Sequence, residues 1–423
     1  MIDIALIRKD PARIAEVAQQ KGVAVDVDRL LHLDAERREL EGGIAECNRL
    51  RKEAAAEKNV ARGKELKEQL SQKEKELKEI EPELQALLLS IPNLPSDDTP
   101  IGSDESANVV LRTVGEPRAL SFKPKDHMEL GISLGLIDTA RAADISGTRF
   151  GYLFGDAVLL QFALMRFAFE TLTNQRALAD IIAKAGLSVL ATPFTPVVPP
   201  VFIKPEVFQK MGRLEPKEER YYIPSDNQFL IGSAEHTLGP LHMDETIPVE
   251  KLPLRYVGYS TSFRREAGSY GKDTHGILRV HQFDKVEMES FTAPGDGLAE
   301  QDFFVAIQEH LVTSLGLPYR VILCSTGDQG TPDARHLDVE VWMPGEGKYR
   351  ETHSADYMTD YQARRLGTRV KDGGGMTYAH MNDATVFAIG RMLIAILENG
   401  QQEDGRVRVP DALQKFVGKE VIG

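Results

Sequence analysis

Residues 27–90 carry a repeating apolar pattern that is typical of long helices. Leucines, isoleucines and small residues recur seven apart in the first half, at Leu33, Leu40, Cys47 and Ala54, with Ile44 at the alternate spacing. From Leu66 to Leu87 the apolar residues continue at steps of three and four. A stripe this narrow is buried when it packs against a second helix. Between the two stripes, Asn59 and Gly63 weaken the helix. We therefore expect an antiparallel hairpin of two helices, each about 27 residues and roughly 40 Å long.

The outer half of this hairpin is basic in an acidic protein. The chain has a formal net charge of −13, which argues against indiscriminate binding of nucleic acid by the whole surface. Residues 48–64 nevertheless contain two acids, Glu53 and Glu57, against six bases, which gives a local charge of +4; the bases are Arg49, Arg51, Lys52, Lys58, Arg62 and Lys64. Such a cluster indicates either a phosphate-binding tip or an ordinary solvated helix surface.

A proline-rich stretch then separates the hairpin from the rest of the 423-residue chain. "SIPNLPSDDTPIGSDES", residues 90–106, contains three prolines and several turn residues, which predicts a linker. We expect an N-terminal domain over residues 1–105 and a second domain over 106–423. There is no apolar run of 18 residues and no secretory signal, and Cys47 and Cys324 show no metal-type spacing. These features favour a cytoplasmic protein without a membrane span.

The second domain mixes strand-like and helical segments. "LRYVGYSTSF", "YRVILCS" and "HLDVEVWMP" alternate as strands do, whereas "DAVLLQFALMRFAFETLTNQ" and "ATVFAIGRMLIAILENGQ" are predicted to be helices, the second ending at Asn399–Gly400. Because strands follow one another with few intervening helices, the sequence favours an α+β fold built on an antiparallel sheet.

Two strand-like segments flank a long polar loop in "FRREAGSYGKDTHGILRVHQFDKVEMESF", residues 263–291. Long polar loops between strands often contact a ligand. Arg264 is suited to hold a phosphate or a carboxylate, and Glu266 lies two residues further, on the same strand face, where it would accept from an amine. The alternative is a surface ion pair.

Three further candidates are weaker when taken alone. Glu287 and Glu289 share one strand face, for which an exposed surface is the alternative, especially at Glu289. Glu351 with the Ser354 hydroxyl would form a pair of hard oxygen ligands suited to Mg²⁺. Arg391 stands within an apolar helical pattern and needs an anionic partner, either a structural carboxylate or a polyphosphate.

Taken together, these segments resemble the bacterial-type seryl-tRNA synthetases, a family of class II aminoacyl-tRNA synthetases, over nearly the whole chain. "VDVDRLLHLDAERREL" resembles the start of the family's helical arm, and residues 263–283 resemble its motif 2 loop. "DVEVWMP", "DYQARR" and "GRMLIAILENGQQEDGRVRVP" are similar to later segments, the last containing motif 3. "VVPP", ending at Pro199–Pro200, resembles the end of motif 1, the element that forms the dimer.

The resemblance implies roles for individual residues. Arg264 would bind the ATP α-phosphate, Glu266 the adenine, and Arg391 the γ-phosphate, while Val280 would pack against the nucleotide. The same implied ATP-binding set includes Arg265, Thr352 and His353, and Glu351 and Ser354 would contact both ATP and Mg²⁺. The implied amino-acid pocket consists of Ser233, Ala234, Glu235, Arg264, Glu287, Asp383 and Thr385. The hairpin tip would bind the long variable arm of tRNA(Ser), and tRNA(Sec) is a further possible substrate.

The sequence departs from the family pattern near the amino-acid pocket. "TAE" becomes Ser233-Ala234-Glu235, "EISSCSN" becomes "ETHSADY" from Glu351 to Tyr357, and "LNGSG" becomes "NDATV" from Asn382. Asp383 then replaces an asparagine, and an ionised aspartate accepts hydrogen bonds but donates none. Its charge would favour a substrate amine or be neutralised by a neighbour. A register shift of one residue would instead give Asn382 that role. Extra residues, "VLATPFT", also precede the motif 1 prolines.

The resemblance implies an ATP-dependent serine–tRNA ligase that works as a homodimer through a seryl-adenylate. Two alternatives stay open. One is a related adenylating enzyme that activates another small amino acid, although such an enzyme has little use for a tRNA-binding arm. The other is a non-catalytic tRNA-binding paralogue, against which the retained Arg264, Glu287 and Arg391 argue.

Overall fold

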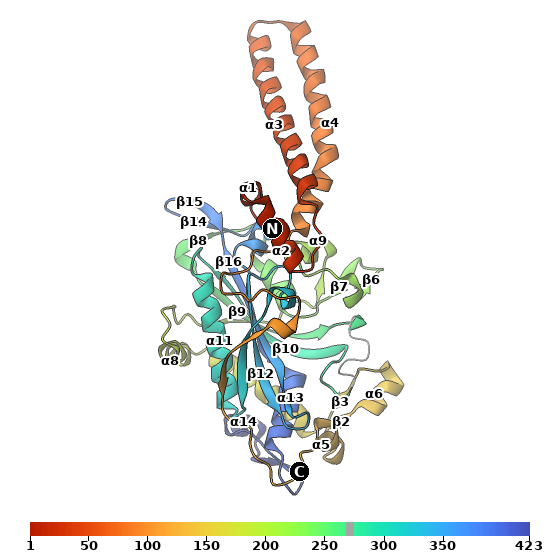
Figure 1. The fold of residues 1–423 in the computed structure, drawn as a ribbon, viewed down its shortest axis with the longest axis vertical. Coiled ribbons are helices and arrows are strands. Elements are labelled where there is room, and N and C mark those ends of the chain that lie inside the picture. The colour runs from red at the N-terminus through yellow and green to blue at the C-terminus, as the bar shows by residue number, and fades with distance from the viewer. Residues whose placement is uncertain (268–274) are drawn as a thin grey trace. The chain divides into compact units, whose positions relative to one another are not determined.

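The computed structural model describes residues 1–267 and 275–423, and these divide into two compact units, Met1–Leu94 and Pro95–Gly423 (Figure 1). The assignment of domains to residues 1–105 and 106–423 stays a prediction. Among the described residues, no helix is both long enough and apolar enough to cross a membrane.

The first unit confirms the predicted helical hairpin. Two short helices, α1 (Ile4–Lys9) and α2 (Pro11–Gln20), precede the long pair α3 (Val27–Ala56) and α4 (Val60–Ser90). The apolar stripe of α3 is buried as its spacing predicts, at Leu33, Leu40, Cys47 and Ala54. Its partners on α4 include the buried Leu66, Leu70 and Leu84. Packing of the two stripes, rather than helix propensity, therefore holds the hairpin together.

The chain reverses between α3 and α4 within three residues. Lys58 adopts a positive φ of 54°, and the Asn59 side chain accepts a hydrogen bond from the Arg62 backbone N–H at 3.1 Å, which caps α4. Near the other end of the hairpin, Arg29 and Glu83 form an ion pair at 2.6 Å between α3 and α4. The turn and this pair fix the register of the two helices.

The second unit is built on a mostly antiparallel sheet, as predicted. Among the described residues it has eight strands in the order β1-β11-β12-β13-β16-β10-β9-β4. Their bounds are β1 (Val109–Val114), β4 (Thr195–Val197), β9 (Leu254–Phe263), β10 (Gln282–Thr292), β11 (Tyr319–Leu323), β12 (Arg335–Met343), β13 (Lys348–Tyr357) and β16 (His380–Ala388). Neighbouring strands are antiparallel except β4, which pairs with β9 in parallel. The strand-like patterns in residues 254–263, 319–323 and 335–343 are thus confirmed.

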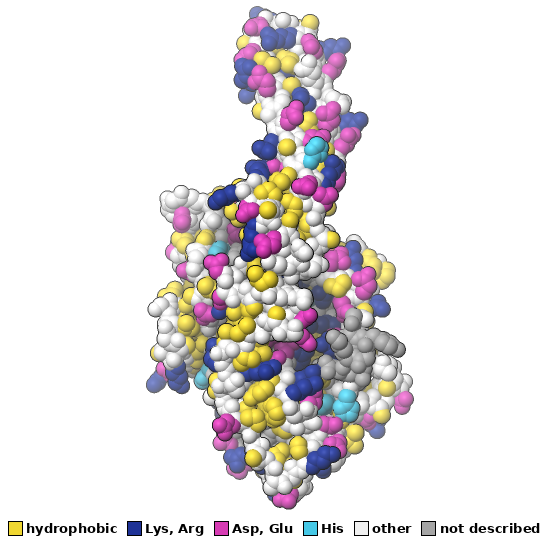
Figure 2. Space-filling view, viewed as in Figure 1, with side chains coloured by type: hydrophobic (Ala, Val, Ile, Leu, Met, Phe, Trp, Pro, Cys, Tyr) yellow, Lys and Arg dark blue, Asp and Glu magenta, His cyan; other side chains and the backbone are white. Residues whose placement is uncertain are grey.

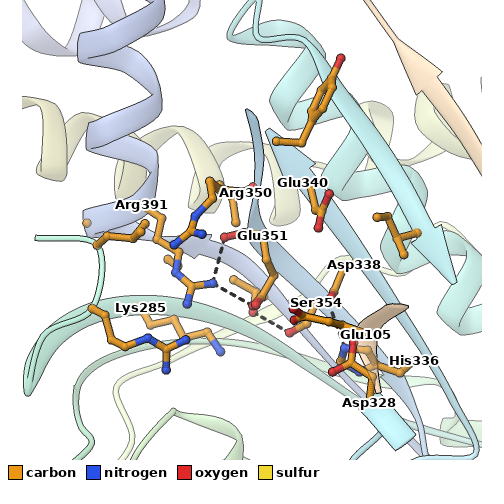
Figure 3. Close-up of a pocket in the computed structure, with 18 of the residues that line it drawn as sticks. Glu105, Lys285, Asp328, His336, Asp338, Glu340, Arg350, Glu351, Ser354 and Arg391 are labelled. Carbon is orange, nitrogen blue, oxygen red and sulfur yellow. Dashed lines mark hydrogen bonds and ion pairs between the residues drawn. The ribbon is translucent and has the colours of Figure 1, made fainter. Parts of the chain in front are cut away.

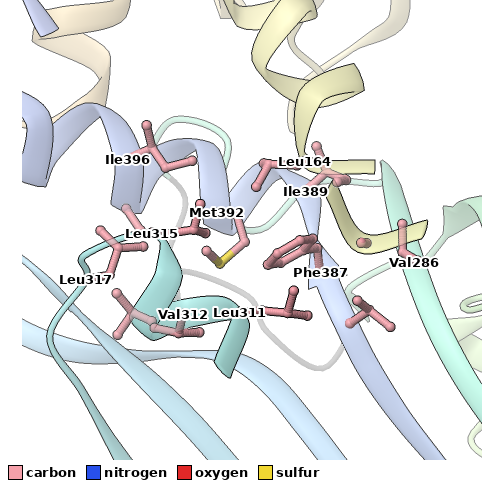
Figure 4. Close-up of a cluster of buried hydrophobic side chains, with 14 of the residues drawn as sticks. Leu164, Val286, Leu311, Val312, Leu315, Leu317, Phe387, Ile389, Met392 and Ile396 are labelled. Carbon is pink, nitrogen blue, oxygen red and sulfur yellow. The ribbon is translucent and has the colours of Figure 1, made fainter. Parts of the chain in front are cut away.

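One face of this sheet is covered by helices and forms the main core (Figure 4). Val286 of β10 and Phe387 of β16 meet Leu164 of α7 (Asp156–Leu172), Leu311 of α11 (Gly297–Ser314) and Met392 of α13 (Ile389–Gly400) there. Because side chains alternate along a strand, the residues between these apolar ones point to the opposite face. The core thereby leaves a second face available for polar groups.

Smaller elements surround the sheet. The helices are α5 (His127–Ser133), α6 (Thr139–Ser146), α8 (Gln175–Ala185), α9 (Pro205–Met211), α10 (Glu235–Leu238), α12 (Tyr361–Leu366) and α14 (Asp411–Val417). The short strands are β2 (Ile137–Asp138), β3 (Tyr152–Leu153), β5 (Phe202–Ile203), β6 (Tyr222–Ile223), β7 (Gln228–Leu230), β8 (Thr246–Pro248), β14 (Arg369–Asp372), β15 (Gly375–Tyr378), β17 (Val407–Arg408) and β18 (Val421–Ile422).

The helix predicted from residue 384 onward is wrong in its first five residues. Residues 384–388 belong to β16, where Ala384 pairs with Met288 of β10 and with Ala355 of β13. An apolar run buried between two strands has no sequence signal that separates it from a buried helix. The helix itself begins at Ile389, which places Arg391 in its first turn with 23% of its side chain exposed. Arg391 is therefore only partly buried, although it stands within an apolar sequence pattern.

A buried ion pair holds the extra segment "VLATPFT" against the sheet. The guanidinium of Arg255, on β9, donates to both carboxylate oxygens of Glu300 on α11, at 2.6 and 2.7 Å. It also donates to the backbone carbonyls of Leu190 and Thr192, at 2.6 and 2.9 Å. A guanidinium whose N–H groups have hydrogen-bond acceptors can be buried without a large net cost in free energy.

Candidate active site

A cavity of about 820 Å³ opens on the sheet face that the helices leave uncovered. Figure 3 shows how charge is divided within it: Lys285, Arg350 and Arg391 lie on one side, and Glu105, Asp338 and Glu340 lie on the other, with Glu351 between them. A cavity with opposed basic and acidic walls suits a ligand that carries both an anionic chain and a cationic or hydrogen-bond-donating group.

The walls of the cavity follow from strand alternation and register. On β10 the residues that face away from the core are Lys285, Glu287 and Glu289. Cross-strand pairing sets one row from Glu289 through Asp383 and Asp356 to His336, across β10, β16, β13 and β12. A second row runs from Glu287 through Thr385 and Ser354 to Asp338, where the Ser354 and Thr385 hydroxyls are 3.2 Å apart. Neighbouring strands thus bring residues that are distant in the chain into continuous polar rows.

Arg264 lies where β9 ends and the polar loop begins. Its backbone N–H donates to the backbone carbonyl of His281, just before β10, at 3.0 Å, and its Nε donates to the Gly232 carbonyl at 3.1 Å. The guanidinium carbon sits 5.4 Å from the centre of the Phe283 ring. These contacts orient the arginine into the cavity. The middle of the predicted loop, residues 268–274, lies outside the described residues.

Glu266 follows Arg264 in an uncommon backbone conformation. Its φ is +55°, and its carboxylate accepts from Arg279 at 2.7 Å. A positive φ at a residue other than glycine costs free energy and is commonly found where function needs it. Val280, which is 9% exposed, lines the same part of the cavity.

Arg391 and Glu351 form an ion pair at the base of α13. Arg391 NH1 is 2.9 Å from both a carboxylate oxygen and the backbone carbonyl of Glu351 (Figure 3). Burial opposes ionisation of Glu351, but the charge of Arg391 outweighs it and lowers the pKa of that carboxyl below its ordinary value. The cavity therefore contains an ionised carboxylate beside a guanidinium.

Glu287 is the centre of a small hydrogen-bonded cluster behind the cavity. Its Oε1 accepts from the Ser233 hydroxyl at 2.8 Å and from Thr385 at 3.4 Å, and it also pairs with the ammonium of Lys285. Burial raises the pKa of Glu287 to about 7, with Lys285 opposing the shift and Glu235 adding to it. Its carboxyl group therefore takes up a proton more readily than an exposed glutamate does.

Asp383, and not its neighbour Asn382, has its side chain on the cavity side of the sheet. Its Oδ2 accepts from Arg213 at 3.1 Å, whereas the neighbouring Asn382 points to the helices and donates to the Gly297 carbonyl at 3.0 Å. Burial and the nearby Glu235 raise the pKa of Asp383 well above its ordinary value, and Arg213 opposes this shift.

The structure brings most of the predicted site residues together. Those that line the cavity are Glu235, Arg264, Glu266, Val280, Glu351, Thr352, Ser354, Thr385 and Arg391. Ser233, Ala234, Glu287 and Asp383 are buried directly behind it. Arg265 is not in the cavity: it is exposed and lies 5.9 Å from the Tyr221 ring. His353 points into the core, 5.8 Å from the Phe387 ring, because β13 turns it to the covered face. The exposed position considered for Glu289 is wrong, since that side chain is fully buried.

Several cavity residues were missed in the sequence. Lys285 stands two before Glu287, and His336, Asp338 and Glu340 alternate along β12, so a period of two was available as a signal. Arg213 has no such signal, because it follows α9 and reaches the site only through the fold.

The oxygen ligands needed by a hard divalent cation are present. Glu340 and Glu351 pair across β12 and β13, and the Ser354 hydroxyl and the Asp338 carboxylate lie one step further along the same strands. This set of donors fits Mg²⁺. His336 is less suited to a metal, because its two ring nitrogens already face carboxylates, with Nε2 2.9 Å from Asp338 and Nδ1 against Asp356.

Comparison with known proteins identifies related chains. Residues 1–95 match the family model of the seryl-tRNA synthetase N-terminal domain, and residues 220–400 match that of the class II tRNA synthetase core domain (G, H, P, S and T). Serine–tRNA ligases from Thermobifida fusca and Mycobacterium ulcerans are 40% and 41% identical, with 100% of this chain and 99% of each relative covered. A crystal structure of seryl-tRNA synthetase from Pyrococcus horikoshii complexed with ATP superimposes with a TM-score of 0.89 at 35% identity, covering 100% of this chain and 99% of that one.

We predict that His336 keeps both ring protons at a pH where a histidine with the ordinary pKa has lost one. Burial disfavours its charge, but Asp356 and Asp338 outweigh that effect and hold the pKa of His336 well above its ordinary value. The stability that this pairing provides is complete below the unfolded-state pKa of about 6.5 and is lost as pH rises through the higher folded-state value. Ring ¹⁵N chemical shifts of the protein, with His336→Gln to assign the signal, measure this directly. Titration of the His336 ring near pH 6.5 would contradict the prediction.

Proposed function

The chain belongs to the seryl-tRNA synthetase family, and we propose from this and from the cavity that it forms seryl-adenylate from serine and ATP before it charges tRNA(Ser). The chain is a ligase that uses ATP to attach serine to tRNA. The observation that carries the proposed mechanism is the convergence of Arg264, Arg391 and Glu351 in one cavity, beside a buried pocket of hydroxyls and carboxyls.

In the first step a serine carboxylate oxygen attacks the α-phosphorus of ATP, and the bond to pyrophosphate breaks. The reaction needs no protein nucleophile, so the contributions of the chain are positioning and charge neutralisation. Arg264 neutralises the α-phosphate, and Arg391 binds the γ-phosphate of a bent ATP. Glu266 accepts from adenine and Val280 packs against the base. Binding of ATP would separate Arg391 from Glu351, since a phosphate offers that guanidinium a stronger partner.

Mg²⁺ fits the carboxylate edge of the same cavity. Glu351 and Ser354 would hold it, with Glu340 and Asp338 close enough to bind its coordinated waters. When bound, Mg²⁺ neutralises charge on the phosphate oxygens. The chain contributes an ionised Glu351 for this purpose, because the carboxyl has a lowered pKa.

Serine would lie between Arg264 and the buried hydrogen-bond cluster. Its carboxylate would face Arg264, and its hydroxyl would donate to Glu287 with Thr385 beside it. Its ammonium would face the carboxylates of Glu235 and Asp383. A buried polar pocket of this kind rejects analogues that lack a hydroxyl or an ammonium, because its own groups would then lose their partners.

In the second step the terminal ribose hydroxyl of tRNA attacks the adenylate carbonyl, and AMP leaves. We propose that the hairpin holds the tRNA through its long variable arm. Figure 2 shows Lys and Arg side chains gathered towards the outer end of the hairpin, with acids among them. Arg49 is paired with Glu46 and Glu53, whereas Lys52, Lys58 and Lys64 are exposed and form no ion pair within the described residues. These lysines are the best placed to contact phosphates.

We also propose that the chain acts as a homodimer with two-fold symmetry. Large apolar side chains are exposed on the two edge strands of the sheet and beside the Pro199–Pro200 segment. They are Val109, Val110 and Leu111 on β1, and Leu190, Val198 and Phe202 around β4. Apolar patches of this kind commonly mark interfaces.

Replacing Arg264 tests the adenylation site. Arg264→Ala removes the charge that faces the α-phosphate, so serine-dependent exchange of pyrophosphate into ATP should fall by about 10²–10³-fold, the usual effect of losing one preorganised group in a transition-state site. Arg141→Ala, an exposed arginine in the same unit, is the control and should exchange as wild type does. Running wild type with every standard amino acid also decides between serine and another small amino acid. Exchange by Arg264→Ala within about tenfold of wild type would refute the assignment.

The arm is tested by separating its effect on adenylation from its effect on tRNA charging. A deletion of residues 30–90 bridged by a short linker should leave pyrophosphate exchange nearly intact and lower aminoacylation by orders of magnitude. Lys52→Glu with Lys64→Glu should lower kcat/KM for tRNA by about tenfold and reduce its salt dependence, since two phosphate contacts are lost. Lys75→Glu with Lys78→Glu, further along α4, is the matched control. Equal charging by the deletion variant and wild type would show that the arm has another role.

Sedimentation checks the dimer. At micromolar concentration we expect a species of about twice the 46.9 kDa chain mass. Val198→Glu and Phe202→Glu, which place charges on the exposed apolar surface, should shift the protein towards the monomer. Sedimentation of the wild type as a 46.9 kDa species alone would exclude a stable dimer.

A further inference from the structure

One arginine, with 15% of its side chain exposed, connects three aspartates that come from separate parts of the second unit. NH2 of Arg213 lies 3.2 Å from Asp333, 3.0 Å from Asp356 and 3.1 Å from Asp383. Asp333 belongs to the loop before β12, Asp356 to β13 and Asp383 to β16. The Arg213 Nε is 4.0 Å from a fourth carboxylate, that of Glu235 on α10. The guanidinium therefore sits at the centre of the acids and also lines the cavity.

These acids would repel one another without the arginine. Asp356 and Asp383 stand directly opposite each other on neighbouring strands, and Asp383 stands opposite Glu289 on the next strand. Like charges at opposed positions destabilise a sheet, and buried carboxylates need a partner in order to stay ionised. Neither carboxylate oxygen of the fully buried Glu289 has a hydrogen-bond partner among the described residues. Arg213 is the cation shared by these acids: with His336 it holds the pKa of Asp356 below its ordinary value, whereas burial and Glu235 raise the pKa of Asp383 well above its ordinary value and Arg213 opposes that shift.

Two of these carboxylates, Glu235 and Asp383, are the groups assigned above to the serine ammonium. Asparagine, which the family pattern has in place of Asp383, would present both an acceptor and a donor, whereas an aspartate presents acceptors alone. Arg213 supplies the missing donor next to Asp383. The pair Arg213–Asp383 therefore offers the same kinds of hydrogen-bonding groups as an asparagine would.

We propose that Arg213 is a positioning residue that determines recognition of the substrate ammonium, by holding Asp383 and Glu235 in place on the wall of the amino-acid pocket. This inference rests on the proposed assignment of those two carboxylates to serine. Arg213 acts through them and does not touch the phosphates, so its influence is confined to the amino acid. It follows that loss of Arg213 impairs serine binding and leaves ATP binding unchanged.

The test is a double-mutant cycle read by serine-dependent pyrophosphate exchange. Arg213→Gln should raise KM for serine at least 30-fold and change KM for ATP less than about threefold, because a buried carboxylate that loses its partner takes up a proton or turns away. Asp383→Asn should raise KM for serine about tenfold. The double variant should be no worse than Asp383→Asn alone, because the neutral amide no longer needs Arg213.

Inhibition by 3-hydroxypropionate, which is serine without its ammonium, provides the readout that a general structural defect would not reproduce. Its Ki should stay within about threefold of wild type in Arg213→Gln, while KM for serine rises, because the two ligands differ in the ammonium alone. Arg365→Gln is the matched control: Arg365 is buried and lies near Gly212, but it faces the Tyr361 hydroxyl and the Gln209 carbonyl. It should leave KM for serine unchanged.

Three results would overturn the inference. They are equal changes in KM for serine and for ATP, a parallel rise in the Ki of 3-hydroxypropionate, or a double variant with the full defect of Arg213→Gln. If Arg213→Gln does not fold, Arg213→Lys, which keeps the charge but contacts fewer aspartates, and the double variant complete the comparison. Absence of serine-dependent exchange in the wild type would instead refute the proposed function itself, which separates the two failures.

Discussion

The pairing of β10 between β9 and β16 is the interaction on which the rest of the second unit depends. It turns Val286 and Met288 into the core beneath the helices and turns Lys285, Glu287 and Glu289 to the opposite face. A slip of one residue would place three charged groups among the apolar side chains of α7, α11 and α13, at a cost of several kcal/mol for each uncompensated charge. Burial of the apolar side chains therefore fixes the register of β10 with its neighbours, and this register fixes the positions of the charged side chains on the opposite face.

Given this register, the chemistry of the cavity follows from how its charges are compensated. A small number of bases compensates the acids of the polar face: Lys285 pairs with Glu287, Arg391 with Glu351, and Arg213 is shared by three aspartates. Buried ion pairs add little to stability, because desolvation offsets most of their attraction. In this cavity the ion pairs matter mainly for how the carboxyl groups meet a bound ligand. The pKa of Glu287 is raised to about 7 and that of Glu351 is lowered, so the two carboxyl groups of the same cavity differ in how readily they take up a proton.

The first unit is organised on a different principle. Its hairpin has a continuous apolar seam between α3 and α4 and a surface of alternating charges, many of them paired within one helix, such as Arg49 with Glu46. Exposed pairs of this kind contribute little to stability, so the seam supports the structure and the surface is free to vary. Departures from the family pattern occur instead around the amino-acid pocket, where a changed residue such as Asp383 is matched by a contact with Arg213 from elsewhere in the chain.

The sequence by itself determined the hairpin, the strands β9, β11 and β12, and nine of the residues that line the cavity, because heptad spacing and alternation are local and motif 2 is nearly continuous. Tertiary structure decided the rest. Residues 384–388 are a strand because β10 and β13 pair with them, and Arg391 is accessible because the helix begins only after that strand. Arg213 meets Asp356 and Asp383 across 143 and 170 positions of the chain. Contacts between residues so far apart in the chain produce no periodic pattern in a single sequence. They form because the sheet brings its strands together and because buried charges are stable only beside groups of opposite charge or hydrogen-bond partners.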